Sequence, residues 1–263
     1  MLTGSASLRA QRWPILVTWC LALAGCAGAP PAPRIAAAAN LNVALAEIEA
    51  AFVRDTGSTL EIIYGASGTL TRQILDGAPF ELFLAADEAF PLRLQAAGLT
   101  ADAGAVYAVG RLALFAPAGS PLRVDEELRG LRALLESNGV TRFAIANPEV
   151  APYGRAAEAT LRAHGLWDRL RPRLVLGDTV AQAAQFATTG DAVGGLLAYP
   201  VVLTPGFRSR GAHVVIPEED HPPIHQRMVL LTRAGPVARR FYEYVQSGTA
   251  RAILRRHGYG MPQ

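Results

Sequence analysis

The sequence predicts an α/β fold with mostly parallel sheets, and three observations carry this prediction. Hydrophobic residues make up 51% of the 263 residues and charged residues 18%, which is typical of a globular chain with a large core. Short apolar or β-branched runs alternate with segments of helical periodicity, and glycines follow many of the helical segments. Such alternation is typical of strands joined by helices, and the length suits one large domain or two lobes.

The first half of the chain opens with a predicted helix. Leu41, Leu45, Ile48 and Phe52 recur at helical spacing, and Gly57 follows them as a stop signal. Three apolar or β-branched runs predict strands, at 59–64, 80–85 and 111–116. Two short helices that end at glycines are expected between these strands, at 70–76 and 90–97.

The second half continues the alternation of helices and strands. Short apolar runs predict strands at 142–146, 174–176, 194–199, 214–216 and 228–231. Helices are expected at 125–136, after Pro152, from near Thr179, and at 237–246 and 250–256. Because helices separate most of the strands, parallel pairing through crossover connections is expected.

The N-terminal segment has the features of a bacterial export signal. Residues 1–13 carry two arginines and no acid, an apolar stretch follows at 14–25, and the run LAGC at 23–26 resembles a lipobox. We therefore expect a signal peptide at 1–25, lipidation of Cys26, a proline-rich tether at 26–34, and a protein held at the membrane in the periplasm or cell envelope. A plain signal peptide with an incidental cysteine is the alternative.

Charge and composition exclude several classes of function. The sequence contains no lysine, so a Schiff base and a phosphate-loop lysine are both excluded. Without Arg9 and Arg12, 23 basic residues face 22 acidic ones, and the net charge falls from +3 to +1. The arginines are scattered, whereas nucleic-acid binding needs a clustered basic face, so no nucleic-acid partner is expected.

Four junctions at predicted helix starts share a chemical character. They combine small residues with a hydroxyl, an amide or a free backbone N–H, in the runs AAAANL (36–41), GASGT (65–69), APYG (151–154) and GDTV (177–180). Small residues let a ligand approach the backbone, and helix starts present unpaired N–H groups with partial positive charge, so several together would bind an anion. The alternative is ordinary capping by Asn40, Ser67 and Thr179, the last in a capping box with Gln182.

Several of these runs closely resemble the periplasmic molybdate-binding proteins of ABC importers. The resemblance is carried by AAANL (37–41), YGASGTLTRQI (64–74), GAPFELFLAAD (77–87), ANPEVAPYG (146–154) and GLWD (165–168). It implies a two-lobed type II periplasmic-binding-protein fold with the ligand between the lobes. The lobes would comprise 35–112 with 224–263, and 113–223. It also implies a binding protein that is no enzyme and needs no cofactor.

The resemblance assigns ligand contacts residue by residue. Asn40 and Ser67 would donate from side chain and backbone in the first lobe, and Ala39 would add a backbone contact. Tyr153 and Val180 would offer backbone N–H groups from the second lobe. Many members of the family have serine at the position of Asn40, which alters the geometry of that contact.

A late tyrosine hydroxyl that members of the family use has no direct counterpart. Ala198 stands at the aligned position, and Tyr199 follows one residue later. Because a shift of one residue along a strand turns the side chain to the other face, Tyr199 is a candidate only if the strand register differs.

The resemblance implies that the chain, as a monomer, binds molybdate, and tungstate as well, and delivers the metal oxyanion to an ABC permease. Sulfate or phosphate as ligand is the alternative within this class. Two alternatives come from other classes: a structural lipoprotein that binds nothing, and a serine hydrolase that uses Ser67 in a near-match to a nucleophile elbow.

The pair His221 and His225 flanks two prolines, so a crossover segment is favoured there over a metal site. Arg155 is expected to be a solvated or interlobe charge.

Overall fold

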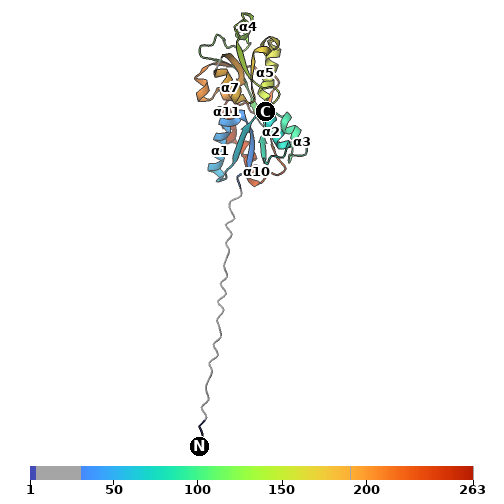
Figure 1. The fold of residues 1–263 in the computed structure, drawn as a ribbon, viewed down its shortest axis with the longest axis vertical. Coiled ribbons are helices and arrows are strands. Elements are labelled where there is room, and N and C mark those ends of the chain that lie inside the picture. The colour runs from blue at the N-terminus through green and yellow to red at the C-terminus, as the bar shows by residue number, and fades with distance from the viewer. Residues whose placement is uncertain (4–30, 190, 263) are drawn as a thin grey trace. The chain divides into compact units, whose positions relative to one another are not determined.

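The computed structural model describes residues 1–3, 31–189 and 191–262, and the folded body comprises residues 32–263 (Figure 1). Residues 4–25 of the predicted signal peptide, Cys26 and residues 27–30 of the tether lie outside the described residues. Within the part that is described, no helix has the length and apolar character that a membrane crossing requires.

The first of two five-stranded sheets has the strand order β2-β1-β3-β10-β4. Its strands are β1 (Arg34–Ala38), β2 (Glu61–Gly65), β3 (Leu82–Leu84), β4 (Ala105–Gly110) and β10 (Ile224–Leu230). The helices that accompany this sheet are α1 (Asn42–Thr56), α2 (Ser67–Leu75), α3 (Ala89–Ala96), α10 (Pro236–Val245) and α11 (Gly248–Arg256). β1 pairs in parallel with β2 and β3, whereas β10 is antiparallel to β3 and β4.

The second sheet has the strand order β7-β6-β8-β5-β9. Its strands are β5 (Leu112–Pro117), β6 (Arg142–Ala146), β7 (Leu174–Gly177), β8 (Ala192–Ala198) and β9 (Gly211–Val215). The accompanying helices are α4 (Arg129–Glu136), α5 (Pro152–Ala163), α6 (Trp167–Leu170), α7 (Val180–Thr188), α8 (Tyr199–Val202) and α9 (Pro205–Arg208). The chain enters this sheet between Gly110 and Leu112 and returns to the first between Val215 and Ile224.

The α/β class is confirmed, but the expectation of mostly parallel sheets is wrong. In the second sheet β6 is parallel to β7 and β8, while β5 is antiparallel to β8 and β9. Each sheet is therefore mixed. The antiparallel strands lie next to the two passages between the sheets, where no helical crossover sets a parallel direction.

Two strands were missed by the sequence patterns. β1 reads RIAAA, and alanine has a low β-propensity, yet its last four residues are buried between β2 and β3. β4 reads AVYAVG and alternates only weakly between apolar and polar residues. The strand expected at 228–231 begins four residues earlier, at Ile224. β10 therefore starts directly after the two prolines at 222 and 223.

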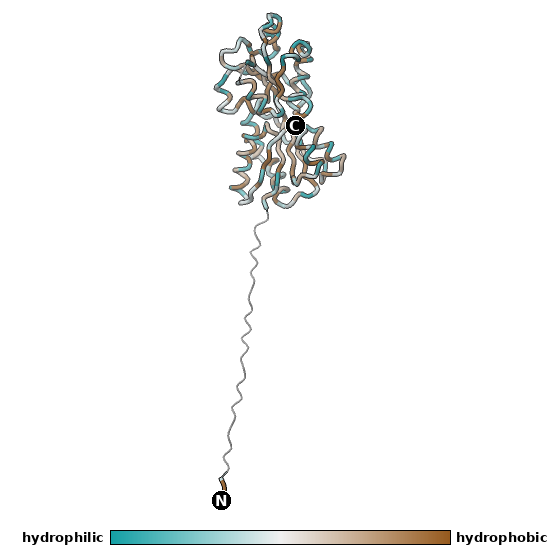
Figure 2. The backbone as a smooth tube through the Cα atoms, in the orientation of Figure 1, coloured by the Kyte–Doolittle hydropathy of each residue, from teal (hydrophilic) through white to brown (hydrophobic). Residues whose placement is uncertain are grey.

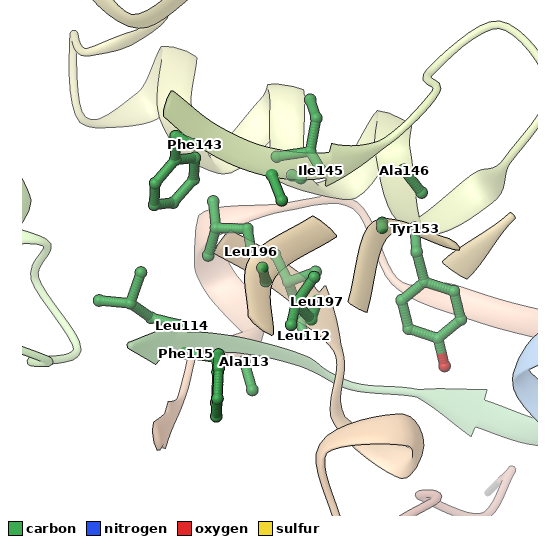
Figure 3. Close-up of a cluster of buried hydrophobic side chains, with 14 of the residues drawn as sticks. Leu112, Ala113, Leu114, Phe115, Phe143, Ile145, Ala146, Tyr153, Leu196 and Leu197 are labelled. Carbon is green, nitrogen blue, oxygen red and sulfur yellow. The ribbon is translucent and has the colours of Figure 1, made fainter. Parts of the chain in front are cut away.

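The apolar side chains of the strands form the cores. Hydrophobic segments of the backbone follow the strands through the folded body (Figure 2). In the second sheet Leu114, Phe115, Phe143 and Ile145 are completely buried and pack into one cluster (Figure 3). Burial of each such side chain contributes about 1.5–3 kcal/mol. These cores fix the strand ends from which the loops after β1, β2, β6 and β7 project.

Candidate anion-binding site

The four junctions singled out in the sequence meet at one small cavity of about 10 Å³. Ala39, Asn40, Ser67, Tyr153 and Val180 all line it, although they come from four separate stretches of the chain. The first two stretches follow strands β1 and β2 of the first sheet, and the other two follow β6 and β7 of the second. The cavity thus lies where loops from both sheets meet.

Helices begin at this cavity with unpaired backbone N–H groups. Ser67 is the first residue of α2, Val180 is the first of α7, and Tyr153 is the second of α5, after Pro152. N–H groups in the first turn of a helix have no acceptor within the helix, and the helix dipole adds partial positive charge there. Three helices of eight or more residues therefore direct donors and positive potential to one place.

The hydroxyl of Ser67 is arranged to donate. Its oxygen accepts the backbone N–H of Ala86 at 3.0 Å, and the side chain is almost completely buried. The residue before it, Ala66, is the N-cap of α2 and makes no side-chain cap. Ser67 is therefore not a capping residue, contrary to the capping interpretation, and its own hydrogen is available to a ligand.

Asn40 is also not a capping residue. It lies in a short 3₁₀ turn, Ala39–Leu41, and its side chain reaches inward to Gln226 and Tyr259. Its Nδ2 lies 3.1 Å from Oε1 of Gln226 and 3.0 Å from the Tyr259 hydroxyl. These contacts fix the amide plane at the edge of the cavity.

Thr179 does cap α7, as the sequence pattern predicted. Its hydroxyl accepts the backbone N–H of Gln182 at 3.1 Å. The Gln182 side chain accepts the N–H of Asp178 at 2.6 Å, one residue earlier than in a standard capping box. Because the cap uses the N–H of Gln182, it leaves the N–H of Val180 at the cavity free of intrahelical bonding.

The lining of the cavity is electrically neutral. Among the lining residues that the structure describes, Tyr153 carries the one ionisable side chain, and burial raises the pKa of its phenol. Figure 3 shows its hydroxyl turned away from the leucines of the core, and Gln226 Nε2 donates to that hydroxyl at 3.0 Å. The site therefore offers donors to an anion but no base that could take a proton from it.

Residues 33–260 match the family described as bacterial extracellular solute-binding protein. The chain belongs to this family. A molybdate-binding protein, ModA, of Azotobacter vinelandii is 36% identical over 91% of this chain and 94% of its own length. The ModA of Rhodobacter capsulatus is 35% identical over 96% of both chains.

A solved structure supports the same relationship for this solute-binding protein. The periplasmic molybdate-binding protein of Azotobacter vinelandii superposes with a TM-score of 0.79 at 30% identity, over 88% of this chain and all of that one. The resemblance seen in the sequence runs and the two-lobed fold are thereby confirmed. The family consists of binding proteins rather than enzymes, and the Ser67 oxygen contacts a backbone N–H instead of an imidazole, so the hydrolase alternative is dropped.

Tyr199 is not among the residues that line the cavity of this solute-binding protein. It is the first residue of α8, its N–H donates to Arg111 O at 2.9 Å, and its ring packs 6.0 Å from the ring of His213. The Arg111 guanidinium lies 5.5 Å from the centre of the Tyr199 ring. The structure therefore places Tyr199 in a cluster with Arg111 and His213.

A second, larger cavity of about 280 Å³ lies beside the first. Asp87, Arg155 and His225 line it, and Arg155 forms an ion pair with Asp87. Arg155 belongs to α5 and Asp87 follows β3, so this ion pair joins elements of the two sheets. Burial raises the pKa of Asp87, and Arg155 opposes that shift. Arg155 is thus an interlobe charge, as expected.

The two histidines of the crossover have separate environments. His221 is buried, with Nδ1 2.9 Å from Pro222 O, whereas His225 is exposed and lies 3.2 Å from a carboxylate oxygen of Glu88. Among the described residues, no group of three or more histidine, cysteine or acidic side chains is placed to hold a metal ion.

Sequence patterns missed the side chains that hold Asn40. Gln226, Tyr259 and Tyr107 lie far from it along the chain, and each is buried. In the sequence Gln226 stands directly after His225, at the end of the expected crossover segment. A buried glutamine in an otherwise apolar strand, IHQRMVL, is the signal that could have identified it, because such a side chain needs hydrogen-bond partners.

Proposed function

We propose that this solute-binding protein captures molybdate in the cell envelope. The observation that carries the proposal is the convergence of helix starts from both sheets on one neutral, donor-lined cavity. Such a site stabilises an anion through N–H and O–H groups without a lysine or arginine. The relatives named for molybdate binding support the choice of oxyanion.

The proposed ligand set uses five residues. Asn40 and Ser67 contribute side-chain and backbone donors, and Ala39, Tyr153 and Val180 contribute backbone N–H groups. Each of these residues lines the cavity. Tyr199 is left outside the set because it packs against Arg111 and His213. Tungstate, a similar tetrahedral dianion, is proposed to bind the same donors.

We further propose how the protein works in the cell envelope. The two lobes close on the oxyanion, because donors from both are needed to satisfy it, and the closed monomer delivers it to the permease of an ABC importer. Lipidation at Cys26 holds the body at the membrane, and residues 26–34 serve as the tether. The lipobox-like run LAGC at 23–26 supports this part of the proposal.

A panel of oxyanions tests the proposal on protein purified without residues 1–26. Molybdate at 100 times its Kd should stabilise the fold by about 2.7 kcal/mol, measured as a rise in melting temperature against chloride at equal ionic strength. Tungstate should act similarly. No stabilisation by any oxyanion would refute the proposal, and a response to sulfate alone would assign the site to sulfate.

The same panel tests selectivity by calorimetry. Phosphate, which is partly protonated at neutral pH, should bind more weakly than molybdate, because its O–H finds no acceptor among neutral donors. An unpaired buried donor costs about 1–3 kcal/mol. Phosphate as the tightest ligand would overturn the assignment.

A further inference from the structure

A buried hydrogen-bond network lies directly behind the candidate site. Gln226 is at its centre: Oε1 lies 3.1 Å from Asn40 Nδ2 and 3.0 Å from the Tyr107 hydroxyl, and Nε2 donates to the Tyr153 hydroxyl at 3.0 Å. The Tyr259 hydroxyl completes the network, 3.0 Å from Asn40 Nδ2. All five side chains are buried. The network therefore connects a proposed ligand of the first lobe to Tyr153 of the second.

The direction of these hydrogen bonds conflicts with anion binding. Both hydrogens of Asn40 Nδ2 are engaged, by Gln226 and by Tyr259. Asn40 Oδ1 is buried and has no hydrogen-bond partner among the described residues. Asn40 lines the cavity, and with both Nδ2 hydrogens engaged its amide has no donor left for an oxyanion there.

Rotating the side-chain amides of Asn40 and Gln226 together by about 180° frees a donor for the anion. Rotation of an amide exchanges its oxygen and nitrogen at nearly the same positions. If Asn40 and Gln226 both turn, Gln226 Nε2 donates to Asn40 Oδ1, and Asn40 Nδ2 is released to donate into the cavity. The Tyr259 hydroxyl, which lies 2.7 Å from Asn40 O, then turns its hydrogen to Asn40 Oδ1.

The other neighbours of Gln226 can follow this reversal. In the reversed network Tyr107 gives its one hydrogen to Ala85 O, 2.8 Å away, instead of Gln226 and accepts from Gln226 Nε2, while Tyr153 donates to Gln226 Oε1. Burial raises the pKa of both phenols, so they keep their hydrogens at neutral pH. Hydroxyls and amides both donate and accept, so the network supports two directions.

The geometry points to Gln226 as the positioning residue that decides which atom of the Asn40 amide faces the anion, with the anion selecting the reversed network. This inference rests on the proposed oxyanion function. Gln226 is suited to this role because its amide can present either a donor or an acceptor to Asn40. A glutamate would present only acceptors when ionised and would hold Asn40 Nδ2 away from the cavity.

A double-mutant cycle on the full chain tests this role by calorimetry with sodium molybdate. Gln226→Glu should weaken binding by roughly 30- to 100-fold in the wild-type background. Asn40→Ser replaces the amide with a hydroxyl that needs no reversal, so in that background Gln226→Glu should weaken binding less than about fivefold. An equal loss in both backgrounds means that the added charge acts on the anion directly, which overturns the inference.

Side-chain amide signals in nuclear magnetic resonance test the reversal without relying on the glutamate variant. The NH₂ signals of Asn40 and Gln226 are assigned from their loss in Asn40→Ser and Gln226→Met. Saturating molybdate should shift both signals together. A shift of Asn40 alone, with Gln226 unmoved, overturns the inference while leaving the proposed function intact. Failure of the wild type to bind any oxyanion overturns both.

Discussion

The hydroxyl of Ser67 has a single hydrogen to give, because its oxygen already accepts the Ala86 N–H at 3.0 Å. Ser67→Ala should therefore weaken molybdate binding by roughly 10- to 100-fold, since a hydrogen bond to a charged group is worth about 1.5–3 kcal/mol. It should also lower the free energy of unfolding by about 1–3 kcal/mol, because the Ala86 N–H is left unpaired. Calorimetry and denaturant unfolding measure the two effects.

The exposed serine Ser209 provides a matched control for this variant. Its hydroxyl makes only a long contact, 3.4 Å, to Pro205 O. Ser209→Ala should leave both affinity and stability unchanged. If Ser67→Ala lowers stability but binds molybdate as tightly as the wild type, the hydroxyl supports only the Ala86 loop and is not a ligand.

At the level of single residues, local motifs located the cavity but not its support. Asn40 and Ser67 stand in short runs of small residues before helices, and such runs can be recognised in the sequence. Gln226 and Tyr259 are 186 and 219 residues from Asn40 along the chain. Contacts over such separations depend on the strand order, which local patterns do not contain. The assignment of ligand contacts stays a prediction until binding is measured.

At the level of elements, helix ends were easier to predict than strands. Gly57, Gly77 and Gly98 all adopt the left-handed conformation that ends a helix, so the sequence located those ends closely. β1 was missed because its alanines pack well in the interior without having a strand-forming preference. Caps were predicted correctly for Thr179 and wrongly for Asn40 and Ser67, whose side chains have partners outside their own helices.

The first turn of α2 contacts the loop that leads to α5. Gly68 N–H donates to Val150 O at 3.0 Å, and a Cβ at Gly68 would lie 3.0 Å from the Phe90 ring and 3.1 Å from Val150. Gly68→Ala should therefore force the two elements apart and weaken molybdate binding by about 5- to 30-fold, or 1–2 kcal/mol. Alanine is the better helix former by about 1 kcal/mol, which offsets part of the cost of this close contact in the free energy of unfolding.

Gly206→Ala is the control for the Gly68 variant. Gly206 is also helical, and a Cβ there would meet no atom within 4 Å. Affinity measured by calorimetry should stay at the wild-type value for this control. Equal affinities of the two variants would show that the contact between α2 and the Val150 loop has no part in binding.

At the level of the whole molecule, sequence patterns predicted the class but not the strand directions. The alternation of strands and helices indicated α/β, whereas β4, β5, β9 and β10 pair antiparallel beside the passages between the sheets. Pairing in those places depends on where the chain crosses from one core to the other. That choice is made by packing across the whole body, so the resemblance to a two-lobed family was needed to anticipate it.

The attachment of the body to a membrane depends on Cys26 in our proposal. Cys26→Ala should remove the acylation site, so the protein should leave the membrane fraction or remain unprocessed. Fractionation together with intact mass measurement checks this, with Cys20→Ala as control, because Cys20 lies within the predicted signal peptide. An unacylated mass for the wild type would contradict the lipobox assignment.

The ion pair between Asp87 and Arg155 should stabilise the closed arrangement of the lobes. Asp87 is the more buried partner, with 13% of its side chain exposed against 41% for Arg155, and burial raises its pKa. Arg155→Met would leave the Asp87 carboxylate buried without its cation. Because one partner is half exposed, the cost should be about 1–2 kcal/mol, seen as roughly 5- to 30-fold weaker molybdate binding at about pH 7.5.

The pH dependence of this loss gives its cause. Removing Arg155 raises the pKa of Asp87 further in the closed state, so closure takes up a proton and becomes more favourable as pH falls. The affinity of Arg155→Met, relative to the wild type at each pH, should therefore recover progressively as the pH is lowered. Adding Asp87→Asn to this variant removes the buried charge and should restore most of the affinity at pH 7.5. A loss that is independent of pH and persists in the double variant would mean that Arg155 acts by packing on Phe90, whose ring centre lies 5.2 Å from the guanidinium.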